Sequence, residues 1–128
     1  MIKTILVDDD FLVLQALETI LSVQDHIEVV GTGSDGKDAV ELYITLKPDL
    51  VLMDIRMEPT TGIEAAETIL KDFPDAKILF LTTFQDDEYI TKALSLGCRG
   101  YLLKQHIKGI LPAIEAVMNG QIVYDSTI

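Results

Sequence analysis

The sequence has little of several features that define large classes of proteins. Cys98 is the only cysteine in 128 residues, so no disulfide can form within the chain, and a reducing compartment is expected. The apolar runs are only a few residues long, too short to span a bilayer. Asp8 follows Met1 so closely that no room is left for the hydrophobic region of a signal peptide. These features predict a soluble, cytoplasmic protein without a membrane partner.

Basic residues are also scarce. The chain has 10 Lys and Arg against 21 Asp and Glu, which gives a net charge of −11. Such a charge disfavours direct binding of this chain to DNA or to an anionic membrane. The length and the 48% hydrophobic content are typical of one globular domain with a real core. The excess of carboxylates therefore needs an explanation.

Short β-branched runs alternate with longer stretches of helical period. Five runs predict strands at residues 5–7, 27–30, 50–53, 78–81 and 101–103. They are almost continuously apolar, which is typical of parallel strands that are covered on both faces.

Apolar residues recur at helical spacing after each strand, and the clearest stripe predicts a last helix over residues 107–118. Prolines and glycines fall between the predicted elements, at Pro48, Pro59, Pro74, Gly97, Gly100 and Gly120. Five strand–helix units predict an α/β fold, (βα)5, with a doubly wound parallel sheet and right-handed crossovers.

Polar residues follow the predicted strands where ligands bind in such sheets, at the carboxyl edge. The run Asp8-Asp9-Asp10 follows the first strand and Asp54 follows the third. Thr82 ends the fourth strand, and Lys104 follows the fifth. Three kinds of polar group are thus expected to meet in one small patch.

The chemistry of this patch favours a metal ion and a phosphoryl group. Two carboxylates about 4 Å apart repel by roughly 4 kcal/mol at an effective dielectric constant of about 20. Either one acid stays protonated, or a hard cation such as Mg²⁺ occupies the cluster. Asp54 could then act as a nucleophile toward phosphorus, while Lys104 and Thr82 hold phosphoryl oxygens. Taken singly, the acid run could be a helix N-cap, Lys104 a solvated lysine and Thr82 a strand end; their joint placement favours the functional interpretation.

Four motifs at these positions resemble the receiver domains of two-component response regulators. They are ILVDDD at 5–10, LMDIRM at 52–57, LFLTTF at 79–84 and GCRGYLLK at 97–104. The resemblance covers almost the whole chain in order and spacing. It implies a flavodoxin-like sheet with strand order 2-1-3-4-5.

The resemblance also implies roles for individual residues. Asp54 corresponds to the aspartate that accepts a phosphoryl group from a histidine kinase. Asp9 would bind Mg²⁺ (or Mn²⁺) directly together with Asp54, Asp8 would act through water, and the backbone carbonyl of Arg56 would supply a further ligand.

Three further positions match the family's switching residues. Lys104 would bind the phosphoryl group, and the Thr82 hydroxyl would move toward it. Tyr101 would be the aromatic residue that rotates inward with Thr82.

The sequence departs from the common family pattern at three places. Glu58 holds a position that is often proline, with Pro59 after it, so an altered loop is expected. Gln105 replaces a cis-proline, as is common in the NarL, FixJ and LuxR subfamily, so the Lys104–Gln105 bond is expected to be trans. Cys98 stands where alanine is usual and is interpreted as a small packed residue.

Arg56 and Phe84, which would flank the attacking water, offer no base, so slow loss of the phosphoryl group is expected.

The subfamily resemblance suggests how the chain is organised. Residues 1–120 would form the receiver domain, and residues 121–128 would begin a linker to a helix-turn-helix DNA-binding domain that this chain lacks. Phosphorylation would remodel the face near the fourth helix and the fifth strand, drive homodimerisation and so regulate transcription. The 107–118 helix and the Leu14 stripe offer apolar surface, part of which could form a dimer face. The chain would contact DNA only through the missing domain. A stand-alone receiver that acts through protein–protein contacts, and one that is never phosphorylated, remain alternatives.

Two other functions are less consistent with the residues. A haloacid-dehalogenase-type phosphatase would use the Asp8-x-Asp10 pair, with Asp8 as nucleophile, but it needs an acidic pair after Lys104. Only Glu115 and Asp125 follow, and Asp54 would have no role. A histidine phosphocarrier using one of the two histidines, His26 or His106, would require a helical bundle.

Overall fold

Five parallel strands form one sheet in the computed structural model, which describes residues 1–83 and 87–125. The order across the sheet is β2-β1-β3-β4-β5. Both the predicted fold class and the strand order are confirmed. The strands are β1 (Ile2–Val7), β2 (Ile27–Gly33), β3 (Leu50–Asp54), β4 (Ile78–Thr82) and β5 (Tyr101–Leu103).

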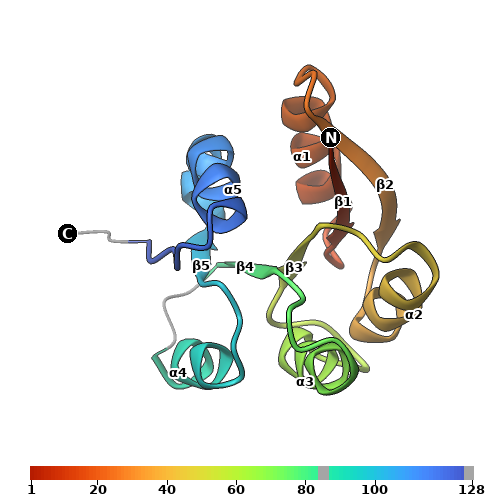
Figure 1. Ribbon diagram of the computed structural model, residues 1–128, viewed down its shortest axis with the longest axis vertical. Helices are drawn as coiled ribbons and strands as arrows, with labels where there is room; N and C mark the ends of the chain where they lie inside the picture. The colour runs from red at the N-terminus through yellow and green to blue at the C-terminus, as the bar shows by residue number, and fades with distance from the viewer. Residues whose placement is uncertain (84–86, 126–128) are drawn as a thin grey trace.

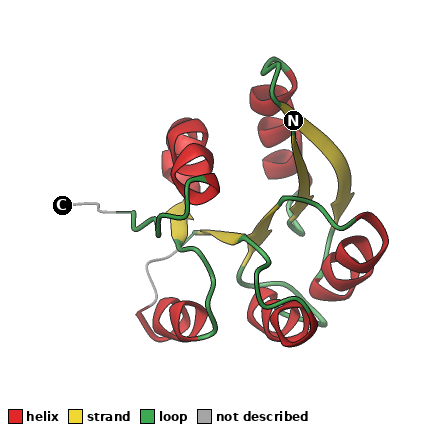
Figure 2. Cartoon of the chain, viewed as in Figure 1, coloured by secondary structure: helices red, strands yellow, loops and turns green. Residues whose placement is uncertain are grey.

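The helices cover both faces of the sheet (Figures 1 and 2). Helices α2, α3 and α4 pack on one face, while α1 and α5 pack on the other. Their bounds are α1 (Phe11–Ser22), α2 (Gly36–Leu46), α3 (Gly62–Asp72), α4 (Asp87–Ser95) and α5 (Ile110–Met118). No helix in the described ranges is long and apolar enough to cross a membrane.

The central strands explain the continuous apolar runs of the sequence. In β3, Val51 and Met53 join the core under α2, α3 and α4, whereas Leu50 and Leu52 join the core under α1 and α5. All five residues of β3 are buried. Because side chains alternate between the two faces of a strand, a sheet covered on both faces needs apolar residues at every position.

The last helix begins later than its apolar stripe predicts. Residues Lys104–Gly109 form a 3₁₀ helix, η1, in which His106 has non-helical dihedral angles, and α5 starts only at Ile110. The reason is Pro112. In a helix starting at residue 107 its ring would clash with the carbonyl of Lys108, whereas in the first turn of α5 its missing N–H costs no hydrogen bond.

The loop after β3 sets the position of the acid at the strand's end. Gly62 N–H donates to the Ile55 carbonyl at 2.8 Å, and a Cβ at Gly62 would overlap the backbone carbonyl of Asp54. Only glycine allows α3 to start so close to this strand. Thr61 and Glu64 then form a reciprocal capping box at the start of α3.

Two of the three departures from the family pattern, at Glu58 and Gln105, concern peptide bonds whose geometry the structure gives. Within the described residues the only cis peptide bond is Glu58–Pro59, in the loop where an altered conformation is expected. The Lys104–Gln105 bond is therefore trans, as predicted.

Candidate phosphoryl-acceptor site

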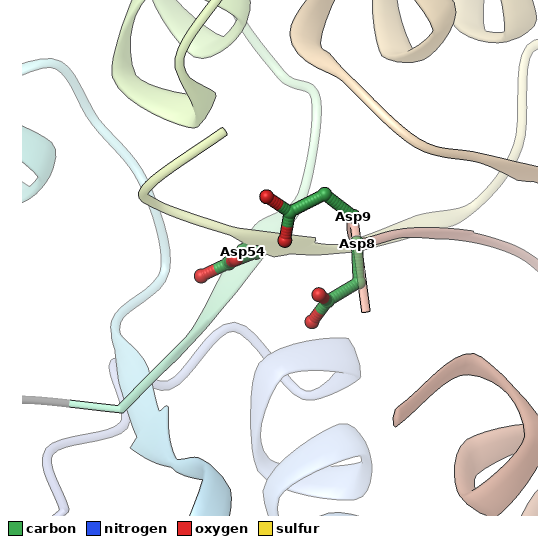
Figure 3. Close-up of side chains that lie close together, drawn as sticks. All are labelled: Asp8, Asp9 and Asp54. Atoms are coloured by element: carbon green, nitrogen blue, oxygen red, sulfur yellow. The ribbon is translucent and has the colours of Figure 1, made fainter. Parts of the chain in front are cut away.

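Three carboxylates gather at the carboxyl edge of the sheet (Figure 3). Asp8 and Asp9 directly follow β1, and Asp54 is the last residue of the neighbouring strand β3. One oxygen from each carboxylate lies within 4.8 Å of the other two. Asp8 and Asp54 are buried, while Asp9 is exposed. The strand ends thus converge as the sequence predicts.

Lys104 completes this cluster from the far side of β4. It follows β5 directly, and its Nζ lies 2.9 Å from Oδ2 of Asp8 and 3.2 Å from Oδ2 of Asp54. The lysine side chain is only 15% exposed, so its ammonium is held between two buried acids. Lys104 is therefore not the solvated lysine of the simpler interpretation.

Burial and charge change the acidity of these groups. Burial, followed by the charge of Asp8, raises the pKa of Asp54 to about 6, although Lys104 and the backbone N–H of Arg56 oppose the rise. Burial also raises the pKa of Asp8. Burial by itself would lower the pKa of Lys104, but its hydrogen bond to Asp8 and the charge of Asp54 outweigh this and raise it.

The donor set suits a hard divalent cation. Carboxylate oxygens are preferred ligands of Mg²⁺, and two ligands at roughly 2.1 Å from the ion stand at most about 4.2 Å apart. The three acids offer oxygens in a cluster only slightly wider than this. A cation would also stabilise the ionised form of Asp54, which burial disfavours. The residues therefore fit Mg²⁺ or Mn²⁺.

A small open cavity of about 270 Å³ lies over the cluster. Its lining residues are Asp9, Asp10, Asp54, Arg56, Thr82, Thr83 and Lys104. Thr82, at the end of β4, is only 3% exposed, whereas its neighbour Thr83 is exposed. The structure thus brings the predicted nucleophile, lysine and hydroxyl residue around one cavity.

Asp10 has a different task from its two neighbours. Its carboxylate accepts the Leu12 N–H at 2.9 Å and caps the start of α1. Its own N–H donates to Oδ1 of Asp8 at 2.8 Å. Asp10 lies outside the three-acid cluster, so the helix-cap interpretation holds for this residue and not for the whole acid run.

Arg56 and Tyr101, to which the family resemblance assigns roles, also contact residues that do not line the cavity. The guanidinium of Arg56 lies 5.2 Å from the centre of the Tyr89 ring on α4. Tyr101, at the start of β5, is buried and its hydroxyl donates to the backbone carbonyl of Asp125 at 3.0 Å. Phe84, expected to flank the attacking water, lies outside the described residues.

The acids and histidines of the alternative functions lie elsewhere. Glu115 lies 3.8 Å from His26, and Asp125 is beside His106 at the edge of β5. Within the described residues neither acid joins the cluster, so the second acidic pair of a phosphatase is not formed. Cys98 is buried, and burial raises the pKa of its thiol to about 12, consistent with a packing role.

The sequence does not predict the contacts of Asp125 and Tyr89. Tyr89 is one aromatic residue on an amphipathic helix. Asp125 lies in a segment without periodicity, and the acid gives no sign that it is buried. The contacts of both residues are long-range, so no local pattern indicates them.

Comparison with known proteins agrees with this geometry. The family model for the response regulator receiver domain matches residues 4–115. The response regulator protein VraR of Staphylococcus aureus (strain Mu3 / ATCC 700698) is 41% identical over 128 residues, which are 99% of this chain and 61% of that protein. This chain thus spans less than two thirds of the curated relatives it matches.

Solved structures give the same result. A LuxR-family two-component response regulator from Aurantimonas sp. SI85-9A1 superposes with a TM-score of 0.91 at 30% identity, covering 99% of this chain and 91% of that one. A LuxR-family DNA-binding response regulator from Staphylococcus aureus gives a TM-score of 0.87 at 28% identity, covering 93% and 100%. The chain is a signalling domain that belongs to the response regulator receiver family, within the NarL/FixJ/LuxR subfamily.

Proposed function

We propose that Asp54 accepts a phosphoryl group from a histidine kinase or from a small acyl phosphate. A carboxylate oxygen of Asp54 forms the new bond to phosphorus. The bond from phosphorus to the donor nitrogen or oxygen breaks, and the donor leaves with the electron pair. The observation that carries this proposal is the convergence of Asp54, Asp8 and Lys104, with both acids within 3.2 Å of one ammonium.

Lys104 has two tasks in this scheme. Before transfer, its ammonium offsets part of the repulsion between Asp8 and Asp54. After transfer, the carboxylate charge of Asp54 is lost, and the ammonium is available to a phosphoryl oxygen. Thr82, buried at the end of β4 on the cavity wall, supplies a hydroxyl to a second oxygen.

Mg²⁺ would be held by Asp9 and Asp54, by Asp8 through water and by the backbone carbonyl of Arg56, and it would supply neutralisation of phosphoryl charge. The buried position of Asp8 suits a residue that holds both the cation's water and Lys104. Asp9 is exposed and can adjust its oxygen to the incoming ion.

The output we propose is control of a DNA-binding effector domain that lies beyond this chain. The support is the description of the S. aureus LuxR-family relative as a DNA-binding response regulator, and the larger size of the curated relatives. Residues 1–120 would be the receiver, and residues 121–128 would lead toward the effector. Phosphorylation would favour dimers and so pair two effector domains on DNA. Light scattering with and without beryllofluoride, a phosphoryl analogue, tests this: an unchanged mass favours a receiver that acts as a monomer.

The acceptor residue is tested by intact-protein mass spectrometry. Incubation with acetyl phosphate and Mg²⁺ should add about 80 Da to the wild-type chain. Asp54→Asn should abolish the addition, whereas Asp75→Asn, on an exposed turn, should retain it. Absence of any addition to the wild type, from acetyl phosphate or from kinases, would instead favour the inert receiver.

A further inference from the structure

The C-terminal segment of residues 121–125 lies along the free edge of β5, where Figure 1 shows the chain running beside that strand. Val123 forms a parallel bridge with Gly100. Its N–H donates to the Arg99 carbonyl at 2.9 Å, and its carbonyl accepts the Tyr101 N–H at 3.0 Å. We call residues 121–125 the edge segment.

The carboxylate of Asp125 extends this pairing by one step. The next N–H along the edge of β5 is that of Leu103, and it donates to Oδ2 of Asp125 at 2.7 Å. Nδ1 of His106 lies 2.9 Å from the same oxygen. Asp125 is 8% exposed, so the carboxylate is buried with both partners in place. A buried, fully partnered acid in a peripheral segment indicates a specific docked position.

The edge segment also contacts the predicted switch residue. The Tyr101 hydroxyl donates to the Asp125 carbonyl at 3.0 Å, and the Tyr124 ring meets the Tyr101 ring edge-on at 6.4 Å between centres. This bond holds the tip of the Tyr101 side chain, so a rotation of that side chain about its Cα–Cβ bond would break it. Gly100 lets the backbone of the edge segment approach this closely, because a Cβ at Gly100 would overlap the carbonyl oxygen of Val123.

The segment is tied to the acceptor site as well as to Tyr101. Leu103, which binds Asp125, is the residue directly before Lys104, and His106 lies in the 3₁₀ helix that Lys104 begins. A backbone movement at Lys104 on phosphorylation of Asp54 would be transmitted to both partners of Asp125. The two sites therefore share one short stretch of backbone.

We propose that the edge segment is an intramolecular latch, held by Asp125 on β5, whose docking and phosphorylation of Asp54 oppose each other. The inference rests on the function proposed above for Asp54. Docking holds Tyr101 and Leu103 in the unphosphorylated arrangement, and phosphorylation loosens the segment. By thermodynamic reciprocity, weakening the latch strengthens binding of a phosphoryl analogue to the acceptor site.

Amide hydrogen exchange and analogue titration, both followed by NMR on the whole chain, test this proposal. Mg²⁺ with beryllofluoride should speed exchange of the Val123 and Leu103 amides by roughly fivefold or more, the lower end of typical coupling between sites. The amide of Val51, in the sheet interior, should show no such increase. Asp125→Ala should bind beryllofluoride more tightly by a similar factor.

Two control variants distinguish loss of the latch from a general effect of removing one negative charge or of disturbing the fold. Asp25→Ala removes the same charge from an exposed turn and should leave the affinity unchanged. Tyr101→Phe keeps the ring but removes the hydroxyl bond, so analogue binding should affect the edge segment less. Where Asp125→Ala folds poorly, Asp125→Asn removes the charge with little change in shape and should act in the same direction.

Failure of the latch can be distinguished from failure of the proposed function. A wild-type protein that binds no beryllofluoride would overturn the proposed function and the latch together. A protein that binds it with unchanged exchange at Val123 and Leu103, or an Asp125→Ala variant with wild-type affinity, would overturn the latch alone.

Discussion

The ammonium of Lys104 lies 3.2 Å from Oδ2 of Asp54, although the two residues belong to strand ends separated by β4. The same ammonium lies 2.9 Å from Asp8, whose side chain is 1% exposed. Lys104 therefore pairs with two buried acids and offsets part of their charge before any phosphoryl group or cation arrives. This relationship determines how the protein responds to mutation and pH.

Replacement of Lys104 should destabilise the cation-free protein. Lys104→Ala leaves Asp8 and Asp54 without their ammonium partner, and removal of one member of a buried ion pair costs about 3 kcal/mol. Urea unfolding in EDTA measures this loss, and Mg²⁺ should restore part of it. Lys108→Ala, an exposed lysine nearby, is the control and should change stability by less than about 0.5 kcal/mol. An equally small effect at Lys104 would contradict the buried pairing.

The raised pKa of Asp54 predicts a pH-dependent penalty on folding. Since this pKa rises from 3.8 to about 6 on folding, the stabilisation from protonated Asp54 is complete below pH 3.8 and is lost as the pH rises through 6. In EDTA above pH 6, Asp54→Asn should therefore be more stable than wild type by about 3 kcal/mol or less.

Denaturant titrations at pH 4, 6 and 8 check this gain, which should be smallest at pH 4. Mg²⁺ should reduce the gain at pH 8, because it stabilises ionised Asp54 in the wild type only. A gain that is the same at all three pH values would show that the titration of Asp54 is not its cause.

Thr82 should be needed for switching more than for phosphorylation. Thr82→Ala removes the buried hydroxyl but leaves Asp54, Asp8 and Lys104 in place, so acetyl phosphate should still add one phosphoryl group. The NMR signals of the Tyr101 ring should then change less on phosphorylation than in wild type. Thr83→Ala, at the exposed neighbouring position, should respond like wild type. A wild-type response of the Tyr101 signals in Thr82→Ala would show that switching does not require Thr82.

The acyl phosphate should be hydrolysed slowly. Arg56 follows the acceptor by two residues and packs on Tyr89, and it offers no base to a water molecule. Arg56→Glu places a carboxylate there and should speed loss of the phosphoryl group by about tenfold or more, since general bases contribute at least that much.

Arg56→Gln is the control, because glutamine has nearly the same shape as glutamate but no basic carboxylate. Any rate change that it shares with Arg56→Glu comes from loss of the guanidinium. Intact mass followed over time gives both rates. A wild-type half-life of seconds would refute slow hydrolysis.

The sequence predicts most of the acceptor site because each of its residues directly follows or ends a recognisable strand. Parallel strands end at one edge, and Asp8, Asp54, Thr82 and Lys104 meet there because the strand order implied by the family resemblance makes β1, β3, β4 and β5 neighbours. The sequence cannot assign Asp10, because capping a helix and binding a cation call for the same side chain at the same position.

The predictions from sequence fail where a single residue or a distant contact decides the structure. The apolar stripe from Ile107 continues through the 3₁₀ helix, but Pro112 decides where α5 begins. The docking of Asp125 on Leu103 joins residues 22 positions apart in the sequence. Such a contact depends on the edge that β5 exposes, which is known only once the strand order is known.

The most direct test of the account locates the phosphoryl group on the chain. Borohydride reduces an aspartyl phosphate to homoserine, which peptide mass spectrometry detects at a single position. After treatment with acetyl phosphate and Mg²⁺, the account predicts homoserine at position 54, and none when donor or Mg²⁺ is omitted. Homoserine at position 8, as a phosphatase using Asp8 would give, or at no position, would contradict it.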